Sequence, residues 1–244
     1  IDVPGAVAGW MTLHERFGKL PLEEVMAPAI RYAEKGYPVT PNISRLWQEA
    51  FENYSKYRDR PEFQGWFDTF APNNTWLKPG EMFRCPDMAK TLKEIAATKG
   101  EAFYRGAIAE KIDAFFKKHN GFLTKEDLAA FKPEWVDPIS VNYHGVDVWE
   151  LPPNGHGITV LMALQILKDM NLAERDCADT MHKQIEAMKL AMVDTAEYVA
   201  EPSFMRVSVD QLLSEDYAAK RRALINDKAI MPEPGDPGCP STVY

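Results

Sequence analysis

A single change in hydrophobic period divides this sequence and most constrains its fold. Up to about residue 131 the apolar residues recur at helical spacing, as in 7–17 and 102–118. Between Pro138 and Leu151 they alternate with a period of two about a His-Gly pair, which predicts a β-hairpin. Helical spacing then returns. We therefore expect a helix-rich α/β chain, of the α+β type, with one clear hairpin.

Glycine and proline mark the expected helix boundaries. A helix over 7–17 should stop at Gly18 as a left-handed C-cap, and the next should start at Pro21. Pro28 should break or restart that second helix. The aromatic-rich stretch from about 42 to 83 predicts a short helix with irregular loops. Further helices are expected over 86–99, 102–118 and 158–170, with a short one capped from Thr124 to about Phe131.

One long helix is expected near residues 180–198, with Asp179 or Thr180 as its N-cap. It carries a stripe at helical spacing, Met181, Ile185, Met188 and Met192. Methionines in such a pattern are typical of a core-facing surface. Asp194 and Tyr198 lie one turn apart on this helix, and we expect them to anchor the loop at Glu201-Pro202 by hydrogen bonds.

Composition excludes several classes of function. The net charge of −8 argues against nucleic acid, because binding phosphates needs clustered Lys and Arg. No apolar run approaches the roughly 20 residues that span a bilayer. The three cysteines lack a CxxC spacing, and the five histidines lack an HExxH spacing. The residues therefore predict neither a metal site nor a membrane segment in this chain.

The last residues suggest chemistry. Residues 226–241 have the Pro, Gly and Asp content of an exposed linker, and they lead to Ser241 and Thr242 followed by two β-formers. The pair fits an ordinary turn, and it also fits a self-cleavage site. If the chain is cut between them, Thr242 would supply a hydroxyl nucleophile, and its new α-amine, with a pKa near ~8, would be the base. We thus divide the chain into 1–225 and a linker and autoprocessing segment, 226–244.

A tight loop at 152–157 offers the other candidate site. His156 stands between two glycines there, and Asn154 precedes them. We take His156 and Asn154 as candidate substrate-binding residues, with a histidine that only forms the turn as the alternative.

Several stretches occur along the chain in the order found in one known family. The chain resembles the large-subunit portion of γ-glutamyltransferases (γ-glutamyltranspeptidases) and of the related cephalosporin acylase-like amidohydrolases. The stretches that carry this resemblance are 3–10 (VPGAVAGW), 21–30 (PLEEVMAPAI), 101–109 (EAFYRGAIA), 121–131 (GFLTKEDLAAF), 152–157 (PPNGHG), and Asp194 with Glu197-Tyr198. Thr242 stands where that family has its autoprocessing threonine.

The resemblance implies an N-terminal-nucleophile (Ntn) hydrolase, an αββα sandwich built by two subunits of one precursor. Residues 1–225 would belong to the large subunit, and the remaining strands and a small subunit would lie outside this chain. Thr242 would accept the γ-glutamyl group of glutathione or a related amide and pass it to water or to an amino-acid or peptide amine. No metal or organic cofactor is implied.

The same resemblance implies that the chain is an excerpt. The family's carboxylate-binding arginine would precede Ile1, and its oxyanion-hole glycines would follow Thr242. We therefore expect this fragment alone to be inactive and to expose an apolar surface where its partner strands belong.

Two departures favour the acylase-like branch. Val243-Tyr244 replaces the usual Thr and His, and the 152–157 loop replaces a Ser-Ser-Gly-Gly type. One alternative is thus a glutaryl- or cephalosporin-type acylase. Another is a non-catalytic helical interaction module.

Overall fold

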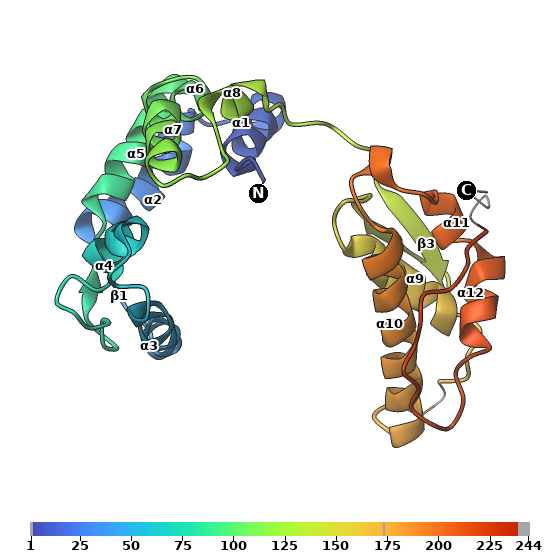
Figure 1. Ribbon diagram of the computed structural model, residues 1–244. Coiled ribbons are helices and arrows are strands. Elements are labelled where there is room, and N and C mark those ends of the chain that lie inside the picture. Colours follow the sequence, from blue (N-terminus) through green and yellow to red (C-terminus); the bar gives the residue numbers. More distant parts are fainter. Residues whose placement is uncertain (1, 173, 239–244) are drawn as a thin grey trace. The chain divides into compact units, whose positions relative to one another are not determined.

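The chain forms two compact units, residues 1–134 and 135–244 (Figure 1). The computed structural model describes residues 2–172 and 174–238. The predicted self-cleavage pair, Ser241 and Thr242, lies outside the described residues. The boundary at residue 225 that the sequence suggests stays a prediction. Each unit is described by itself.

Unit 1 is built mainly of helices. Its short strands β1 (Tyr37–Pro38) and β2 (Met82–Phe83) pair antiparallel. Its helices are α1 (Ala6–Phe17), α2 (Leu22–Lys35), α3 (Pro41–Ser55), the 3-10 turn η1 (Pro61–Phe63), α4 (Gln64–Phe70), α5 (Pro86–Thr98), α6 (Glu101–Tyr104), α7 (Ala107–Lys118) and α8 (Lys125–Ala130).

The first two helices begin and end near the expected signals, with two corrections. Gly18 follows α1 in an extended conformation at φ −64°, so the prediction of a left-handed cap there is wrong. Pro28 does not interrupt α2, which runs continuously to Lys35. A proline removes one hydrogen bond and crowds one carbonyl of a helix. Helix α2 packs along α5, and Pro28 itself is exposed, so its ring is on the solvent side of the helix.

The rest of unit 1 is more helical than the sequence indicates. The aromatic stretch forms the 15-residue helix α3 and the helix α4, in place of one short helix. The expected helix over 102–118 is divided into α6 and α7 at Gly106, whose extended backbone precedes Ala107. The capping box is confirmed, because the Thr124 hydroxyl accepts from the Asp127 N–H and the Asp127 carboxylate accepts from the Thr124 N–H.

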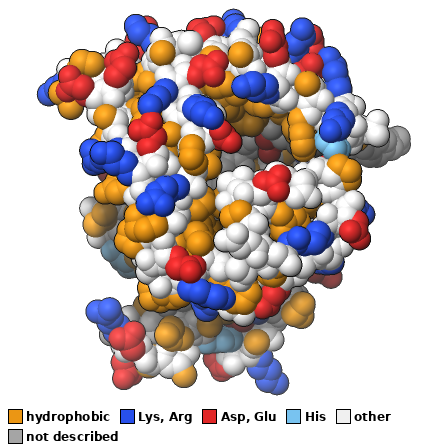
Figure 2. Space-filling model, turned by 90° about the vertical axis from the view of Figure 1, so that its left-hand side faces the viewer, with side chains coloured by type: hydrophobic (Ala, Val, Ile, Leu, Met, Phe, Trp, Pro, Cys, Tyr) orange, Lys and Arg blue, Asp and Glu red, His pale blue; other side chains and the backbone are white. Residues whose placement is uncertain are grey.

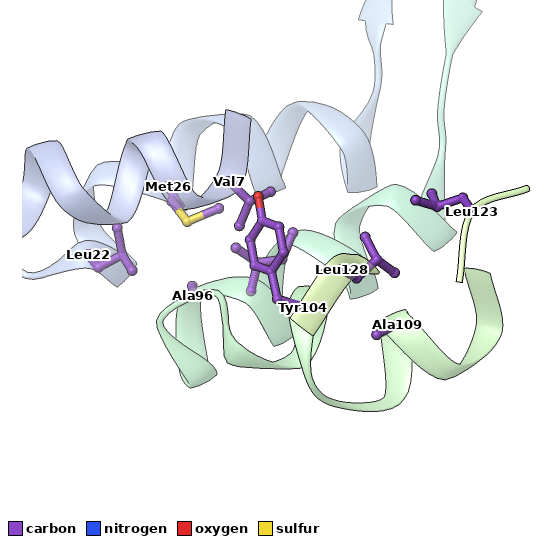
Figure 3. Packing of buried hydrophobic residues seen from close by; sticks show 9 residues of the cluster. Val7, Leu22, Met26, Ala96, Tyr104, Ala109, Leu123 and Leu128 are labelled. Carbon is purple, nitrogen blue, oxygen red and sulfur yellow. The ribbon is translucent and has the colours of Figure 1, made fainter. Parts of the chain in front are cut away.

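A buried tyrosine organises the core of unit 1 (Figure 3). Tyr104 is 4% exposed and lies among side chains from α1, α2, α5, α7 and α8. Its hydroxyl donates to the Pro4 carbonyl at 2.7 Å and accepts from the Ala8 N–H at 3.0 Å. It therefore satisfies a donor in the first turn of α1 that no helical carbonyl could reach.

Unit 2 contains the predicted hairpin. β3 (Ile139–Tyr143) pairs antiparallel with β4 (Val146–Glu150), and Val141 faces Val148. His144 and Gly145 form the turn at φ 51° and 86°, the positive values that a two-residue hairpin loop favours. The helices of unit 2 are α9 (Gly157–Leu167), α10 (Ala178–Tyr198), the 3-10 turn η2 (Pro202–Phe204), α11 (Val209–Leu212) and α12 (Glu215–Arg222).

Helix α9 is the centre of unit 2. It contacts β3 and β4, α10 and α12, and it is apolar around most of its circumference, as expected of a helix covered on several sides. Ile158 and Leu161 are completely buried. Its end at Leu167 is three residues earlier than the sequence predicts.

Helix α10 corrects two expectations. Its N-cap is Cys177, whose sulfur accepts from the Thr180 N–H, rather than Asp179 or Thr180. The predicted core stripe is instead exposed on the isolated chain, between 36% and 58% for its four members, Met181, Ile185, Met188 and Met192. The buried face of α10 includes small residues and two acids, Glu186 and Asp194. The types of side chain on α10 therefore do not show which face of the helix is buried by other parts of the chain.

Charges of both signs share the surface. On the face drawn in Figure 2, Lys and Arg side chains are interspersed with Asp and Glu. Among the described residues, no helix is both long enough and apolar enough to cross a membrane.

Candidate functional site

The loop at 152–157 leads directly from β4 into α9. Pro153 is buried at its start, and Asn154 and His156 are exposed. His156 is the N-cap residue of α9, where its carbonyl accepts from the Thr159 N–H at 3.0 Å while its side chain makes no capping bond. The imidazole is thus held at the start of the helix by its backbone and faces solvent.

His156 borders a hollow of about 370 Å³ between α9 and α10. The lining residues are His156, Thr159, Met188, Met192, Thr195 and Ala196. At its floor Thr195 donates to the Ala191 carbonyl, so the hydroxyl of Thr159, 2.8 Å away, is the donor to Thr195. Both hydroxyl protons are therefore already used within the protein. The hollow has an apolar wall, which includes Met188 and Met192, and the His156 imidazole at its rim.

A buried ion pair stands on the opposite side of α10. The Nε atom of Arg221 lies 3.0 Å from Oδ2 of Asp194, and their side chains are 5% and 1% exposed. Arg221 also donates to the Glu233 carbonyl at 2.8 Å. Asp194 accepts from the Gly235 N–H at 2.9 Å. The pair therefore binds main-chain groups of the segment that approaches the predicted cleavage site.

The environment shifts the pKa values in this cluster. Burial raises the pKa of Asp194 above its ordinary value, and the Gly235 N–H and the charge of Arg221 counteract part of that rise. Burial, followed by the charge of Asp194, raises the pKa of Tyr217. Glu186 behaves oppositely: its hydrogen bond from Lys189 lowers its pKa, with a smaller contribution from the Ile230 N–H.

Asp194 and Tyr198 share one face of α10, as the sequence predicts, but their partner differs. From the sequence we expect both side chains to anchor the loop at Glu201-Pro202. In the structure Asp194 accepts from the Gly235 N–H, and the Tyr198 hydroxyl donates to the Gly235 carbonyl. A partner 37 to 41 residues away cannot be read from helical spacing.

The structure brings some predicted site residues together with others that the sequence did not reveal. His156 shares its hollow with Thr159 on α9 and Thr195 on α10. The two threonines are 36 residues apart on different helices, so their positions in the sequence gave no reason to combine them. The sequence does not single out Arg221, because it belongs to the basic run 220–222 at the end of α12, and such runs are usually solvated. Thr242 and Ser241 lie outside the described residues. Within 2–172 and 174–238, no group of three or more His, Cys, Asp or Glu residues could hold a metal ion.

Comparisons of sequence cover nearly the whole chain. A profile of the family described as Gamma-glutamyltranspeptidase matches residues 1–244. The Glutathione hydrolase proenzyme of Pseudomonas aeruginosa is 34% identical over 235 residues, 94% of this chain and 40% of that protein. The Acylase ACY 1 proenzyme of Pseudomonas sp. strain V22 is 34% identical over 228 residues, with 92% and 40% covered. The chain thus spans 40% of the length of these two relatives.

Comparisons with solved structures find proteins of the same two kinds, a transpeptidase and an acylase. A crystal structure of cephalosporin acylase from Bacillus halodurans matches with a TM-score of 0.94 at 52% identity, covering 97% of this chain and 44% of that one. A crystal structure of Helicobacter pylori gamma-glutamyltranspeptidase matches with a TM-score of 0.85 at 29% identity, covering 96% and 68%. These likenesses confirm the predicted fold class, a helix-rich α/β chain.

Proposed function

The chain belongs to the gamma-glutamyltranspeptidase family, as its ordered stretches predict, and on that premise we propose that it is the large-subunit portion of an Ntn-hydrolase that is cut before Thr242. The observation that carries this proposal is the family match over residues 1–244, which includes the Ser241-Thr242 pair. Both relatives described above are named as proenzymes, which supports processing of a precursor.

The proposed cleavage needs no group beyond the chain and water. The Thr242 hydroxyl oxygen attacks the carbonyl carbon of Ser241, and the C–N bond between the two residues breaks. The Thr242 nitrogen takes the proton that the hydroxyl loses and becomes an amine. Water then opens the resulting ester, which frees the Ser241 carboxylate and restores the hydroxyl. The products are two chains, the second of which begins with an amine and a hydroxyl on one residue.

The mature enzyme would use that residue twice. The α-amine of Thr242 takes the hydroxyl proton while the oxygen attacks the γ-glutamyl amide of glutathione or a similar donor. The leaving amine receives the proton, and an acyl-enzyme remains on Thr242. Water or an amino-acid or peptide amine then takes the acyl group. A small subunit from the same precursor would complete the site.

His156 and Asn154 are our proposed substrate contacts within this chain. Both are exposed, and His156 borders the 370 Å³ hollow. An imidazole at that rim can donate a hydrogen bond to a carboxylate or carbonyl of the acyl group.

A second candidate, a glutaryl- or cephalosporin-type acylase, is favoured by one specific observation. The chain is 52% identical to the Bacillus halodurans cephalosporin acylase and 29% identical to the Helicobacter pylori transpeptidase. A glutaryl group has the same length as a γ-glutamyl group but lacks its α-amine. Measuring kcat/KM for γ-glutamyl-p-nitroanilide and glutaryl-p-nitroanilide on the full-length protein separates the two candidates.

The proposal is tested by the intact mass of the full-length protein, as wild type, as Thr242→Ala, and as Thr75→Ala, a control that removes an exposed threonine. We expect two fragments that join at Ser241–Thr242 from the wild type and the control, and one uncut chain from Thr242→Ala. An uncut wild type would refute the nucleophile and favour the non-catalytic interaction module.

A further inference from the structure

The last described segment is attached along one helix by side chains that bind its backbone. We call residues 226–238 the terminal strap. It runs beside α10 in Figure 1, in dark red, and its points of attachment follow one another in the same order as the residues of the helix that hold them. An extended segment has no internal partners for its peptide groups, so these attachments replace a sheet neighbour.

The first half of the terminal strap is held by three side chains of α10. His182 Nε2 lies 2.7 Å from the Asn226 carbonyl, and since a carbonyl only accepts, the imidazole is the donor. The buried carboxylate of Glu186 accepts from the Ile230 N–H at 3.3 Å. Lys189 donates both to Glu186 and to the Ile230 carbonyl. Residue 230 is thus bound through both of its peptide groups.

The second half is held by side chains of α10 and α12. Arg221 binds the Glu233 carbonyl, and Asp194 and Tyr198 bind the two backbone groups of Gly235. The backbone lies so close here that a Cβ atom on Gly235 would be 2.5 Å from the Tyr217 hydroxyl and 2.9 Å from an Arg221 nitrogen. Only glycine permits this approach.

The final attachment lies at Gly238. The Gln211 side-chain nitrogen donates to the Gly238 carbonyl at 2.7 Å, while its oxygen accepts from the Ser208 N–H in the capping box of α11. Gln211 is therefore fixed at both ends of its amide. Two residues separate Gly238 from Ser241, and these three residue steps reach at most about 11 Å when fully extended.

From this arrangement we propose that the terminal strap is a positioning device for self-cleavage: Arg221 holds Glu233, Asp194 and Tyr198 hold Gly235, and Gln211 holds Gly238. The chain is thus fixed three positions before Ser241, and cleavage before Thr242 is faster than it would be from a loose segment. This inference rests on the proposed cleavage before Thr242. Fixing the chain at Gly238 limits the freedom of the short segment that carries the bond to be cut. This lowers the entropic part of the activation barrier for bringing that bond into its reactive geometry. The strap therefore sets the rate of cleavage, whereas the chemistry belongs to Thr242.

Two substitutions test the strap without removing a buried charge. Tyr198→Phe deletes the donor to the Gly235 carbonyl. Gln211→Glu keeps the oxygen that caps α11 but replaces the donor to the Gly238 carbonyl with a repelling oxygen. The matched controls are Tyr32→Phe and Gln184→Glu, which make the same chemical changes at exposed positions, the second of them on α10 itself.

The measurement is the time course of cleavage of the freshly synthesised full-length precursor, followed by intact mass at constant pH, with the Tm of each variant. Loss of one hydrogen bond predicts a rate about fivefold lower for each variant and a larger decrease for the pair. The plateau of cleaved protein should equal that of the wild type, because a positioning defect slows the reaction whereas misfolding would lower the plateau.

The outcomes are distinguishable. If Tyr198→Phe and Gln211→Glu are cleaved at the wild-type rate with unchanged Tm, the strap has no positioning role. A lower plateau together with a lower Tm would assign these residues to stability and would equally overturn the proposal. An uncut wild type would refute the proposed function itself, and the strap's role in cleavage with it.

Discussion

Replacing Arg221 with methionine tests how the buried pair of unit 2 contributes to stability. Arg221→Met keeps most of the side-chain volume but leaves the Asp194 carboxylate, which is 1% exposed, without its cation. Removing one partner of a buried pair costs roughly 3–5 kcal/mol. The lost donor to the Glu233 carbonyl contributes about 1 kcal/mol within that range.

The double variant separates charge from packing. In Asp194→Asn with Arg221→Met neither member of the pair carries a charge, and the asparagine oxygen can still accept from the Gly235 N–H. We therefore expect the double variant to be more stable than Arg221→Met alone, by about 2 kcal/mol. Such non-additivity is what a direct charge interaction produces.

The effect has a defined pH dependence. Burial raises the folded-state pKa of Asp194, so ionising this group costs stability. Its contribution is most favourable below the unfolded pKa, near ~3.9, and is lost as the pH rises through the folded pKa. Without Arg221 the pKa of Asp194 should rise further. The stability difference between wild type and Arg221→Met should thus be small near pH 4 and grow toward neutral pH.

The assay is urea unfolding read by hydrogen-exchange mass spectrometry on peptides from unit 2, which separates this unit from unit 1. Lys220→Met, an exposed neighbour on α12, is the matched control. The reasoning would be refuted if Arg221→Met lost less than about 1 kcal/mol at pH 7, or if the double variant were less stable than the single one.

Two further predictions concern unit 1. Leu128→Ala, at a fully buried position, should lower the free energy of unfolding by about 2–5 kcal/mol in urea titrations, and a loss no larger than that of the exposed control Leu13→Ala would contradict the packing described. Thr124→Ala removes the hydroxyl half of the capping box and should cost about 1 kcal/mol, with faster amide exchange at Asp127; Thr124→Ser should restore protection, and equal exchange in both variants would rule out the cap.

Local chemistry allowed much of the fold to be predicted. The hairpin turn at His144-Gly145, the capping box at Thr124 and the helix from Pro86 each depend on residues within a few positions of one another. The errors at Pro28 and Gly106 concern two residues that often interrupt helices. Helix α2 continues through the exposed Pro28, while the chain breaks at Gly106, where the backbone lies against Ala102. Residue type alone does not distinguish these two outcomes.

The site was less accessible to sequence reasoning. Asp194 and Tyr198 could be placed on one face of a helix, but their common partner Gly235 comes after two further helices. The exposed stripe on α10 shows the same limit. Methionine spacing identifies an apolar face, and only the surrounding elements decide whether that face is covered.

The attachments of the terminal strap are made to its peptide groups, so its length is constrained more strictly than most of its side chains. Four positions do depend on the residue type: Gly235 has no room for a methyl group, Gly238 has a φ of 91°, Ile230 packs against the core, and Pro237 is buried. The exposed side chains of the strap could be exchanged without touching the attachments. Deleting a residue between 230 and 235 would leave Glu186 or Asp194 facing the wrong peptide, so the exposed positions should tolerate substitution while the segment rejects changes of length.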